Sequence, residues 1–296
     1  MNATLHRFHV GKFACTIVPD GSFAYEHPAA VFFANAPADT LDAALHAHRI
    51  DATAWQQYVS PYPSLVIDTG RERVLVDTGA GKLAPTTGQL QRNLRGAGIE
   101  PESIDIVVIT HGHADHIGGI VTADGKLAFP RASFVMWSTE WDFWTNAPDL
   151  SALHIPAFIR QALLASAAHN LPPLAGRVEL LTGEGEIVPG IQALAAPGHT
   201  PGHMALSIRS EGAQLLHLVD TVLHPIHMEH PEWVSAVDLL PAATVATRRR
   251  LLARAAEEQA RVMVYHFPAP GLGIVMAAND GWTWNCLLYT SPSPRD

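Results

Sequence analysis

The feature that most limits what this chain can fold into is a histidine cluster directly after an apolar segment. Residues 104–109 read Ile-Asp-Ile-Val-Val-Ile, and residues 110–116 read Thr-His-Gly-His-Ala-Asp-His. A short run of β-branched residues predicts a buried strand. The histidines therefore lie where a strand ends and a loop begins, and the fold must contain a buried sheet.

The spacing within this cluster is typical of a metal site. Residues two apart in extended backbone point the same way, so His111 and His113 can bind one ion together. Asp115 and His116 then face elsewhere, which predicts a second ion a few ångströms from the first. The alternative is a histidine-rich loop without metal, because the chain holds 17 histidines.

Composition indicates a single large domain. Of the 296 residues, 48% are hydrophobic, enough for a sizeable core, and no linker or short repeat divides them. We predict one domain over residues 1–285, with no signal peptide or membrane span, and expect a cytoplasmic protein. Residues 286–296 resemble a translated sequencing-library adapter and are expected to be non-native. Cys15 and Cys286 cannot form a disulfide framework.

The charge balance argues against a polyanionic partner. The formal net charge is −9, whereas nucleic-acid affinity comes largely from neutralising phosphates. The basic run 248–250 falls in a predicted helix that continues to Glu257, so we interpret it as a solvated helix face. We expect neither a nucleic-acid nor a membrane partner.

The remaining patterns predict alternating short strands and helices. Strands are predicted over 12–18 (ended by a turn at Asp20-Gly21), 64–68, 73–77, 133–137, 178–181, 191–195, 204–209, 215–219, 261–265 and 281–284. The strands from 178 to 219 have an antiparallel pattern. Helices are predicted over 37–48, 88–95, 156–168 and 242–260, with a shorter one capped by Thr139.

Further ligand candidates follow other predicted strands. His199 lies in the turn Pro-Gly-His-Thr-Pro-Gly-His that begins at Pro197, while Asp220 and His266 each end an apolar strand. Each is weak evidence alone. With the first loop they supply five histidines and two carboxylates, which is what two hydrolytic metal ions sharing a bridging carboxylate require.

These segments resemble the metallo-β-lactamase superfamily, through the His-x-His-x-Asp-His loop, the Pro-Gly-His turn and the strand-terminal Asp. The resemblance implies an α/β fold, an αββα sandwich with the metal site at one edge between the two sheets. The implied ligands are His111, His113 and His199 for the first metal, Asp115, His116 and His266 for the second, and Asp220 as the bridge. Asp77 matches a position that orients ligands.

The implied cofactors are two divalent metal ions, zinc first, with manganese, cobalt or iron as alternatives. Such ions lower the pKa of a shared water, which allows hydrolysis without a covalent protein intermediate. Asp115 and Asp220 are the predicted catalytic carboxylates, and Asp115 can orient the nucleophile or receive its proton.

Within the superfamily, segments 77–81, 183–191 and 266–273 look most similar to the branch of methyl parathion hydrolase and related lactonases and arylesterases. This predicts a neutral small-molecule ester as substrate, either a lactone or an aryl ester, with phosphotriesters also hydrolysed. A hydroxyacylglutathione-type thioesterase remains an alternative, and a β-lactamase or ribonuclease is disfavoured by Asp220 and by the net charge respectively. A homodimer is the candidate assembly.

Several histidines and aromatic residues have no assigned role. His224, His227 and His230 repeat at three-residue spacing, which favours an exposed histidine-rich loop over a pocket lining. His203 matches no ligand position. The aromatic residues divide between core and a candidate pocket lining: Phe23, Tyr25, Phe32, Phe33, Trp141, Phe143, Trp144 and Trp233.

Overall fold

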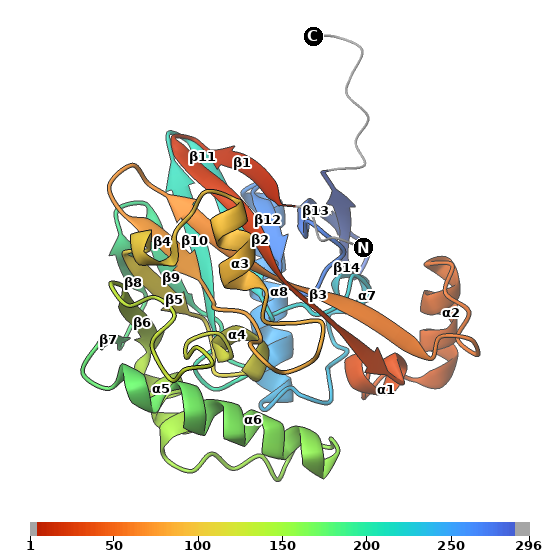
Figure 1. Ribbon diagram of the computed structural model, residues 1–296. Coiled ribbons are helices and arrows are strands. Elements are labelled where there is room, and N and C mark those ends of the chain that lie inside the picture. Colours follow the sequence, from red (N-terminus) through yellow and green to blue (C-terminus); the bar gives the residue numbers. More distant parts are fainter. Residues whose placement is uncertain (1–4, 288–296) are drawn as a thin grey trace.

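The computed structural model describes residues 5–287. Two seven-stranded sheets pack face to face, and helices cover their outer faces (Figure 1). The strand order is β1 to β7 in the first sheet and β14 to β8 in the second. The predicted αββα sandwich is confirmed.

The first sheet is antiparallel through β4 and parallel from β4 to β7. Its strands are β1 (His6–Val10), β2 (Phe13–Glu26), β3 (Gln57–Asp68), β4 (Arg73–Val76), β5 (Ile106–Ile109), β6 (Ser133–Trp137) and β7 (Val178–Leu181). The long strands β2 and β3 pair from Ala14 to Glu26, and their far ends carry the first two helices beside the sandwich (Figure 1).

The second sheet is antiparallel except for the parallel pair β11 and β12. Its strands are β8 (Gly185–Val188), β9 (Ile191–Ala195), β10 (Met204–Ser210), β11 (Ala213–Val219), β12 (Arg261–Val264), β13 (Leu272–Ala278) and β14 (Gly281–Cys286).

The helices bury one side against the sheets. They are α1 (Pro28–Phe32), α2 (Ala38–Ala47), α3 (Leu90–Gly96), α4 (Ala114–Ile117), α5 (Ser138–Thr145), α6 (Ala157–Asn170), α7 (Ile226–Glu229) and α8 (Pro241–Glu257), with 3-10 turns at Pro101–Ser103 and Pro172–Leu174. Helices α3 to α6 pack on the first sheet and α8 on the second. Among the described residues, no helix is long and apolar enough to cross a bilayer.

Strand β5, which leads to the histidine cluster, is buried on both faces. Val107 and Ile109 pack under the helices of the first sheet, while Val108 packs between the sheets against residues such as Leu206. A strand covered on both sides reads as a continuous apolar run, which explains why it is visible in the sequence.

Strand β2 continues through the turn predicted at Asp20-Gly21, so that prediction is wrong. The register with β3 shifts between Pro19 and Gly21, which marks a bulge. The Asp20 carboxylate points inward and accepts hydrogen bonds of 2.9–3.0 Å from the backbone N–H groups of Ala80, Gly88 and Leu90.

Strand β7 was predicted among antiparallel neighbours, but it runs parallel to β6 in the first sheet. The chain between them crosses over through α5 and α6, and such a crossover returns the chain in the same direction. The sequence patterns also miss β8 and β13, which are interrupted or preceded by glycine. Helix α5 begins at Ser138 after Trp137, so Thr139 is not its cap.

The basic run is only partly a solvated helix face. Arg249 and Arg250 are exposed, but Arg248 is fully buried, and burial lowers its pKa to about 10. Its guanidinium donates to the carbonyl oxygens of Thr221 at 2.8 Å, of Pro231 at 3.1 Å and of Trp233. Arg248 thus holds the loop that follows β11.

Strand β14 extends past the domain boundary predicted at residue 285. Cys286 pairs with Gly273, and the backbone N–H of Leu287 donates to Leu272 at 3.1 Å. The described part of the predicted tail therefore contributes to the second sheet. Residues 288–296 lie outside the described residues.

Candidate metal centre

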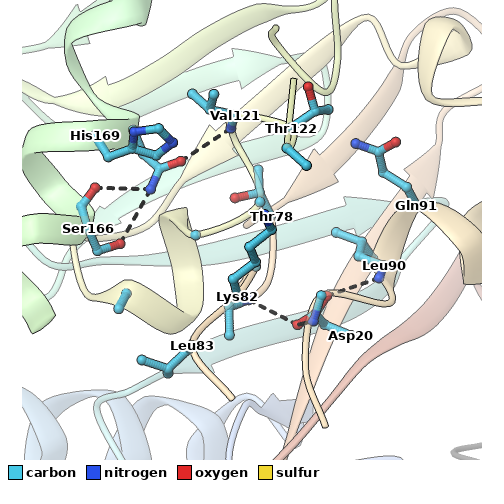
Figure 2. Close-up of a pocket in the computed structure, with 18 of the residues that line it drawn as sticks. Asp20, Thr78, Lys82, Leu83, Leu90, Gln91, Val121, Thr122, Ser166 and His169 are labelled. Atoms are coloured by element: carbon cyan, nitrogen blue, oxygen red, sulfur yellow. Dashed lines mark hydrogen bonds between the residues drawn. The ribbon is translucent and has the colours of Figure 1, made fainter. Parts of the chain in front are cut away.

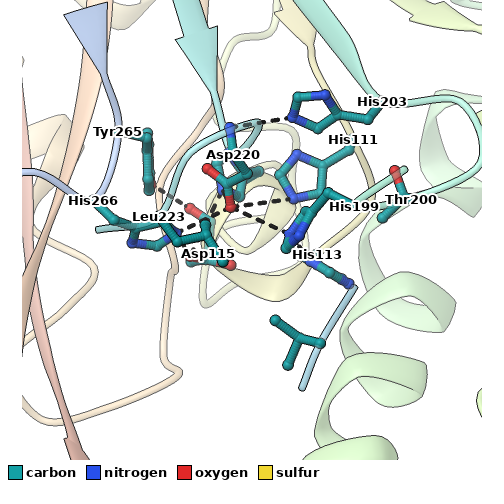
Figure 3. Close-up of polar contacts among 12 residues, drawn as sticks. His111, His113, Asp115, His199, Thr200, His203, Asp220, Leu223, Tyr265 and His266 are labelled. Atoms are coloured by element: carbon teal, nitrogen blue, oxygen red, sulfur yellow. Dashed lines mark hydrogen bonds and ion pairs between the residues drawn. The ribbon is translucent and has the colours of Figure 1, made fainter. Parts of the chain in front are cut away.

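The seven predicted ligands come together at one edge between the sheets (Figure 3). They form two groups whose ligand atoms lie within 4.8 Å of one another: His111, His113 and His199 in one, and Asp115, His116, Asp220 and His266 in the other. All seven are buried, and Asp115, at 8% exposure, is the most accessible. The grouping agrees with the expectation that the two halves of the histidine loop serve separate ions.

The Asp220 carboxylate lies between the two groups. Its Oδ2 atom is 3.7 Å from His111 Nε2, 3.4 Å from His199 Nε2, 3.3 Å from His116 Nε2 and 3.0 Å from His266 Nε2. One oxygen atom within reach of imidazoles from both groups has the placement that a bridging ligand needs.

The donor set fits divalent cations. The Nε2 atoms of His111 and His116 and the Oδ1 atom of Asp220 are buried and have no hydrogen-bond partner among the described residues. Protein interiors seldom leave such atoms unpaired, because each costs free energy. Imidazole nitrogen and carboxylate oxygen are ligands of zinc and related ions, so the unpaired atoms are explained if they bind metal.

The electrostatics of the site favour the metal-binding protonation states of His111, His113 and Asp220. Burial and neighbouring histidines hold the pKa values of His111 and His113 well below the ordinary range, so both imidazoles are neutral. Burial opposes ionisation of Asp220, but His266 and His116 outweigh it and keep its pKa well below the usual value. Neutral imidazoles and a charged carboxylate are the forms that bind a cation. Despite burial, Asp220 and other nearby carboxylates raise the pKa of His116 well above the ordinary value and that of His199 to about 9, so these two imidazoles must lose a proton when metal binds.

Asp77 orients the histidine loop, in agreement with the sequence-based prediction. Its Oδ2 atom lies 2.7 Å from His116 Nδ1, and its carboxylate accepts bonds of 2.8 Å from both the backbone N–H and the hydroxyl of Thr110. Asp77 has φ of +59°, an uncommon backbone conformation outside glycine. The outer nitrogen of His116 is thereby fixed, and Nε2 faces the centre.

Two further orienting contacts were not predicted. Asp238 Oδ1 lies 2.8 Å from His199 Nδ1, and Ser60 Oγ lies 2.9 Å from His266 Nδ1. Both partners are distant in sequence from the histidine they contact, so no local spacing announces them. Four of the five predicted ligand histidines thus hold their Nδ1 atom against a supporting side chain, as His111 does with Thr110. His113 is the exception, because its Nδ1 atom faces His199 Nε2 at 2.9 Å.

Glu140 connects the two loops that carry the first ligand group, and this role was also missed. Its Oε1 atom accepts hydrogen bonds from the Gly112 N–H at 2.8 Å and the Trp144 indole at 2.7 Å. Its Oε2 atom accepts from the Thr200 hydroxyl at 2.8 Å and the Gly202 N–H at 2.7 Å. The side chain is fully buried, so it fixes the loops rather than meeting substrate.

His203 is a positioning residue rather than a ligand. Its Nε2 atom accepts a hydrogen bond of 3.2 Å from the Asp220 N–H, so Nδ1 donates to the Ala196 carbonyl at 3.1 Å. Burial and the neighbouring His199 lower its pKa to about 3. The preceding Val219 has φ of +50°, a strained conformation for a β-branched side chain, and the His203 contact helps to hold it.

The histidines after Asp220 do not form an exposed loop, so that prediction is wrong. The His224 ring packs against the rings of Phe32, Phe33, Trp55 and Tyr58, and burial lowers its pKa to about 3. His227 is buried and its Nε2 donates to the Phe32 carbonyl at 2.6 Å. His230 stacks on Trp233 with ring centroids 3.9 Å apart. The aromatic residues around these histidines, among them Phe32, Phe33 and Trp233, belong to one buried hydrophobic cluster.

A separate cavity of about 820 Å³ lies on the opposite side of α4, between α3 and α6 (Figure 2). Ala114 and Gly118 line it, whereas Asp115 and His116 of the same helix belong to the metal centre. Its buried polar side chains are already paired: Asp20 with backbone N–H groups and Asn170 with the Val121 N–H at 3.2 Å. The cavity therefore contributes nothing to the metal centre.

The chain matches known hydrolases in sequence and structure. N-acyl homoserine lactonase AiiA from Bacillus thuringiensis subsp. kurstaki is 26% identical over 166 residues, which are 49% of this chain and 57% of AiiA. The match thus spans little more than half of that relative. AidC, a dizinc quorum-quenching lactonase, superimposes with a TM-score of 0.88 and 26% identity over 96% of this chain and 97% of its own.

The hydrolase AbOPH of the beta lactamase superfamily has the same fold, with a TM-score of 0.84 and 23% identity over 98% of this chain and all of its own. A model of the Metallo-beta-lactamase superfamily matches residues 58–266, which include all seven residues of the metal centre. Because this match covers well over half of the sequence, the chain belongs to the metallo-β-lactamase superfamily.

Proposed function

We propose that this protein is a dinuclear metal hydrolase that opens lactones, with acyl homoserine lactones as the first candidates. The observation that carries the proposal is the single Asp220 oxygen within 3.0–3.7 Å of four imidazole nitrogens from both ligand groups. AiiA and AidC, which are similar to this chain, are lactonases, and this similarity supports a lactone as the substrate.

His111, His113 and His199 would hold one ion, Asp115, His116 and His266 the other, and Asp220 both. When bound, the ions supply a water of lowered pKa and polarise the ester carbonyl. Zinc is the proposed metal, because histidine and carboxylate suit it and AidC is dizinc; manganese, cobalt and iron suit the same donors.

The side chain of Asp115 would then accept the proton that the reaction releases. Asp115 is the most accessible member of the centre, and its Oδ2 atom lies 3.5 Å from His266 Nε2. It accepts the proton that the attacking water loses as the new C–O bond forms at the carbonyl carbon. The bond to the leaving oxygen breaks, and that oxygen takes up the proton held by Asp115 to give the ring-opened hydroxy acid.

The test is kcat/KM for the zinc-loaded and manganese-loaded protein on an acyl homoserine lactone, an aryl ester, a nitrophenyl phosphotriester, a glutathione thioester and a cephalosporin. We expect the lactone to be preferred, with two metal ions per chain by elemental analysis. An Asp220→Asn variant should lose both metal and activity. Preference for another substrate, or inactivity with both ions bound, would refute the lactonase proposal.

A further inference from the structure

Two tyrosines meet beside the metal centre. Tyr25 on β2 and Tyr62 on β3 place their hydroxyl oxygens 2.7 Å apart. Tyr62 is buried, and its ring meets the edge of the His266 ring with centroids 5.5 Å apart. Tyr25 is only partly buried and packs edge-on against Phe32, part of the aromatic cluster next to the centre.

The surroundings of the two hydroxyl groups determine which of them donates the hydrogen bond. The Tyr62 hydroxyl has no hydrogen-bond partner other than Tyr25 within residues 5–287. If Tyr25 donated, the Tyr62 proton would be left in the core without an acceptor, which costs free energy. Tyr62 therefore donates and Tyr25 accepts. The Tyr25 proton then has no acceptor in the part of the chain that the structure describes, and it is free to meet a bound molecule.

The Tyr25 hydroxyl is also close enough to the centre to be affected by its charges. Burial, followed by the negative charges of Asp115 and Asp220, raises the pKa of Tyr25 well above its ordinary value. The phenol is consequently a hydrogen-bond donor at neutral pH rather than a base. Asp115 is the most exposed of the seven residues of the centre, so one of the charges that act on Tyr25 belongs to its most accessible carboxylate.

We propose that the Tyr25 hydroxyl donates a hydrogen bond to the leaving oxygen of the ester as its C–O bond breaks. The electron pair of that bond passes to the leaving oxygen, which gains negative charge, while Tyr25 keeps its proton. Tyr62 holds the Tyr25 oxygen in place by donating to it. This inference rests on the proposed ester hydrolysis and makes Tyr25 a catalytic residue that favours alkoxide leaving groups.

The test compares Tyr25→Phe with Tyr62→Phe on two esters of the same acyl chain, one a lactone with an alkoxide leaving group and one a nitrophenyl ester. A nitrophenolate needs little stabilisation, whereas an alkoxide needs much. We expect Tyr25→Phe to lose about 10–100-fold in kcat/KM on the lactone and less than about threefold on the nitrophenyl ester. Tyr62→Phe, which keeps the donor, should lose less on the lactone than Tyr25→Phe.

Readouts other than turnover separate this role from a structural one. Metal content of Tyr25→Phe should match the parent protein, and its Tm should fall only modestly, because the Tyr62 hydroxyl loses its acceptor. Its Kd for the ring-opened product should rise by about 2–10-fold in calorimetry. Equal losses on both esters, no loss on the lactone, or loss accompanied by metal release would overturn the inference alone. Inactivity of the parent protein on both esters would instead refute the proposed function, and this inference with it.

Discussion

His203 Nε2 accepts a hydrogen bond from the backbone N–H of Asp220 at 3.2 Å. Because this contact fixes the proposed bridging residue, we expect His203→Ala to weaken metal binding by about 10–100-fold, as judged by chelator competition. His217→Ala is the matched control, since His217 is equally buried and, among the described residues, its side chain hydrogen-bonds only to the Met263 carbonyl, at 3.2 Å. It should lose stability but keep metal affinity. Equal metal loss in both variants would contradict a positioning role for His203.

The two side chains that contact the outer nitrogens of His199 and His266 should differ in how much they contribute to metal affinity. Asp238 supports His199 with a charged oxygen, whereas Ser60 supports His266 with a neutral hydroxyl. Hydrogen bonds to charged groups are the stronger ones. We expect Asp238→Ala to reduce metal affinity more than Ser60→Ala, within a range of about 10–100-fold for such residues. Zinc retained after dialysis against graded chelator measures both, and the reverse order would show that charge does not decide the contribution.

Much of the metal centre was predictable because its ligands follow apolar strands in recognisable short segments. His111, His113 and His199 stand in such segments, and the structure brings them together. The supporting residues carry no comparable signal. Asp238 lies 39 residues from His199, and Ser60 lies 206 residues from His266. These contacts depend on how β3 and the loop before α8 fold back onto the site, which no local pattern encodes.

Burial of polar residues accounts for the wrong predictions. His224 and Arg248 looked solvent-exposed because histidine spacing and basic runs are usually surface features. In the structure aromatic rings pack around His224, and three backbone carbonyl groups accept hydrogen bonds from Nε and Nη1 of Arg248. Asp20 was read as a turn residue, yet its carboxylate is satisfied by backbone N–H groups inside the fold. Long-range partners override local composition at all three positions.

The hydrogen bonds of Glu140 predict that the substitution Glu140→Gln, although small, lowers the stability of the fold. Each of its oxygens accepts two hydrogen bonds, so Glu140→Gln would place an amide N–H group against two donors. We expect the metal-free protein to lose about 1–3 kcal/mol in free energy of unfolding, measured with urea. Glu258→Gln, at a surface ion pair with Arg209, should stay within about 0.5 kcal/mol of the parent. An unchanged free energy of unfolding in Glu140→Gln would mean that the carboxylate is not needed to hold the loops.

The contact between α2 and α7 predicts a pH-dependent stability. His48 Nε2 lies 2.8 Å from Glu229 Oε1, and this hydrogen bond, with the charge of Glu229, raises the pKa of His48 despite partial burial. Because the pKa of His48 is higher in the folded protein, its protonation adds to the free energy of unfolding. This contribution is complete below about pH 6.5, the pKa of histidine in the unfolded chain, and disappears as pH rises through the pKa in the folded protein. The gap in unfolding free energy between the parent and His48→Gln should therefore shrink from pH 6 to pH 9. His46→Gln, an exposed position on α2, is the control, and a constant gap would exclude the linkage.

The last strand predicts different outcomes for two truncations. Cys286 pairs with Gly273, and the Leu287 N–H donates to Leu272, so removing 286–296 deletes contacts of β14 with the sheet. We expect Tm to fall by about 2–4 °C, the change that a loss near 1 kcal/mol produces in a domain of this size. Removing only 288–296, which is most of the segment 286–296 that the sequence predicts to be non-native, should leave Tm unchanged. Thermal unfolding of both truncated forms with metal bound measures the difference, and an equal fall in both would contradict the prediction that the segment 286–296 is non-native.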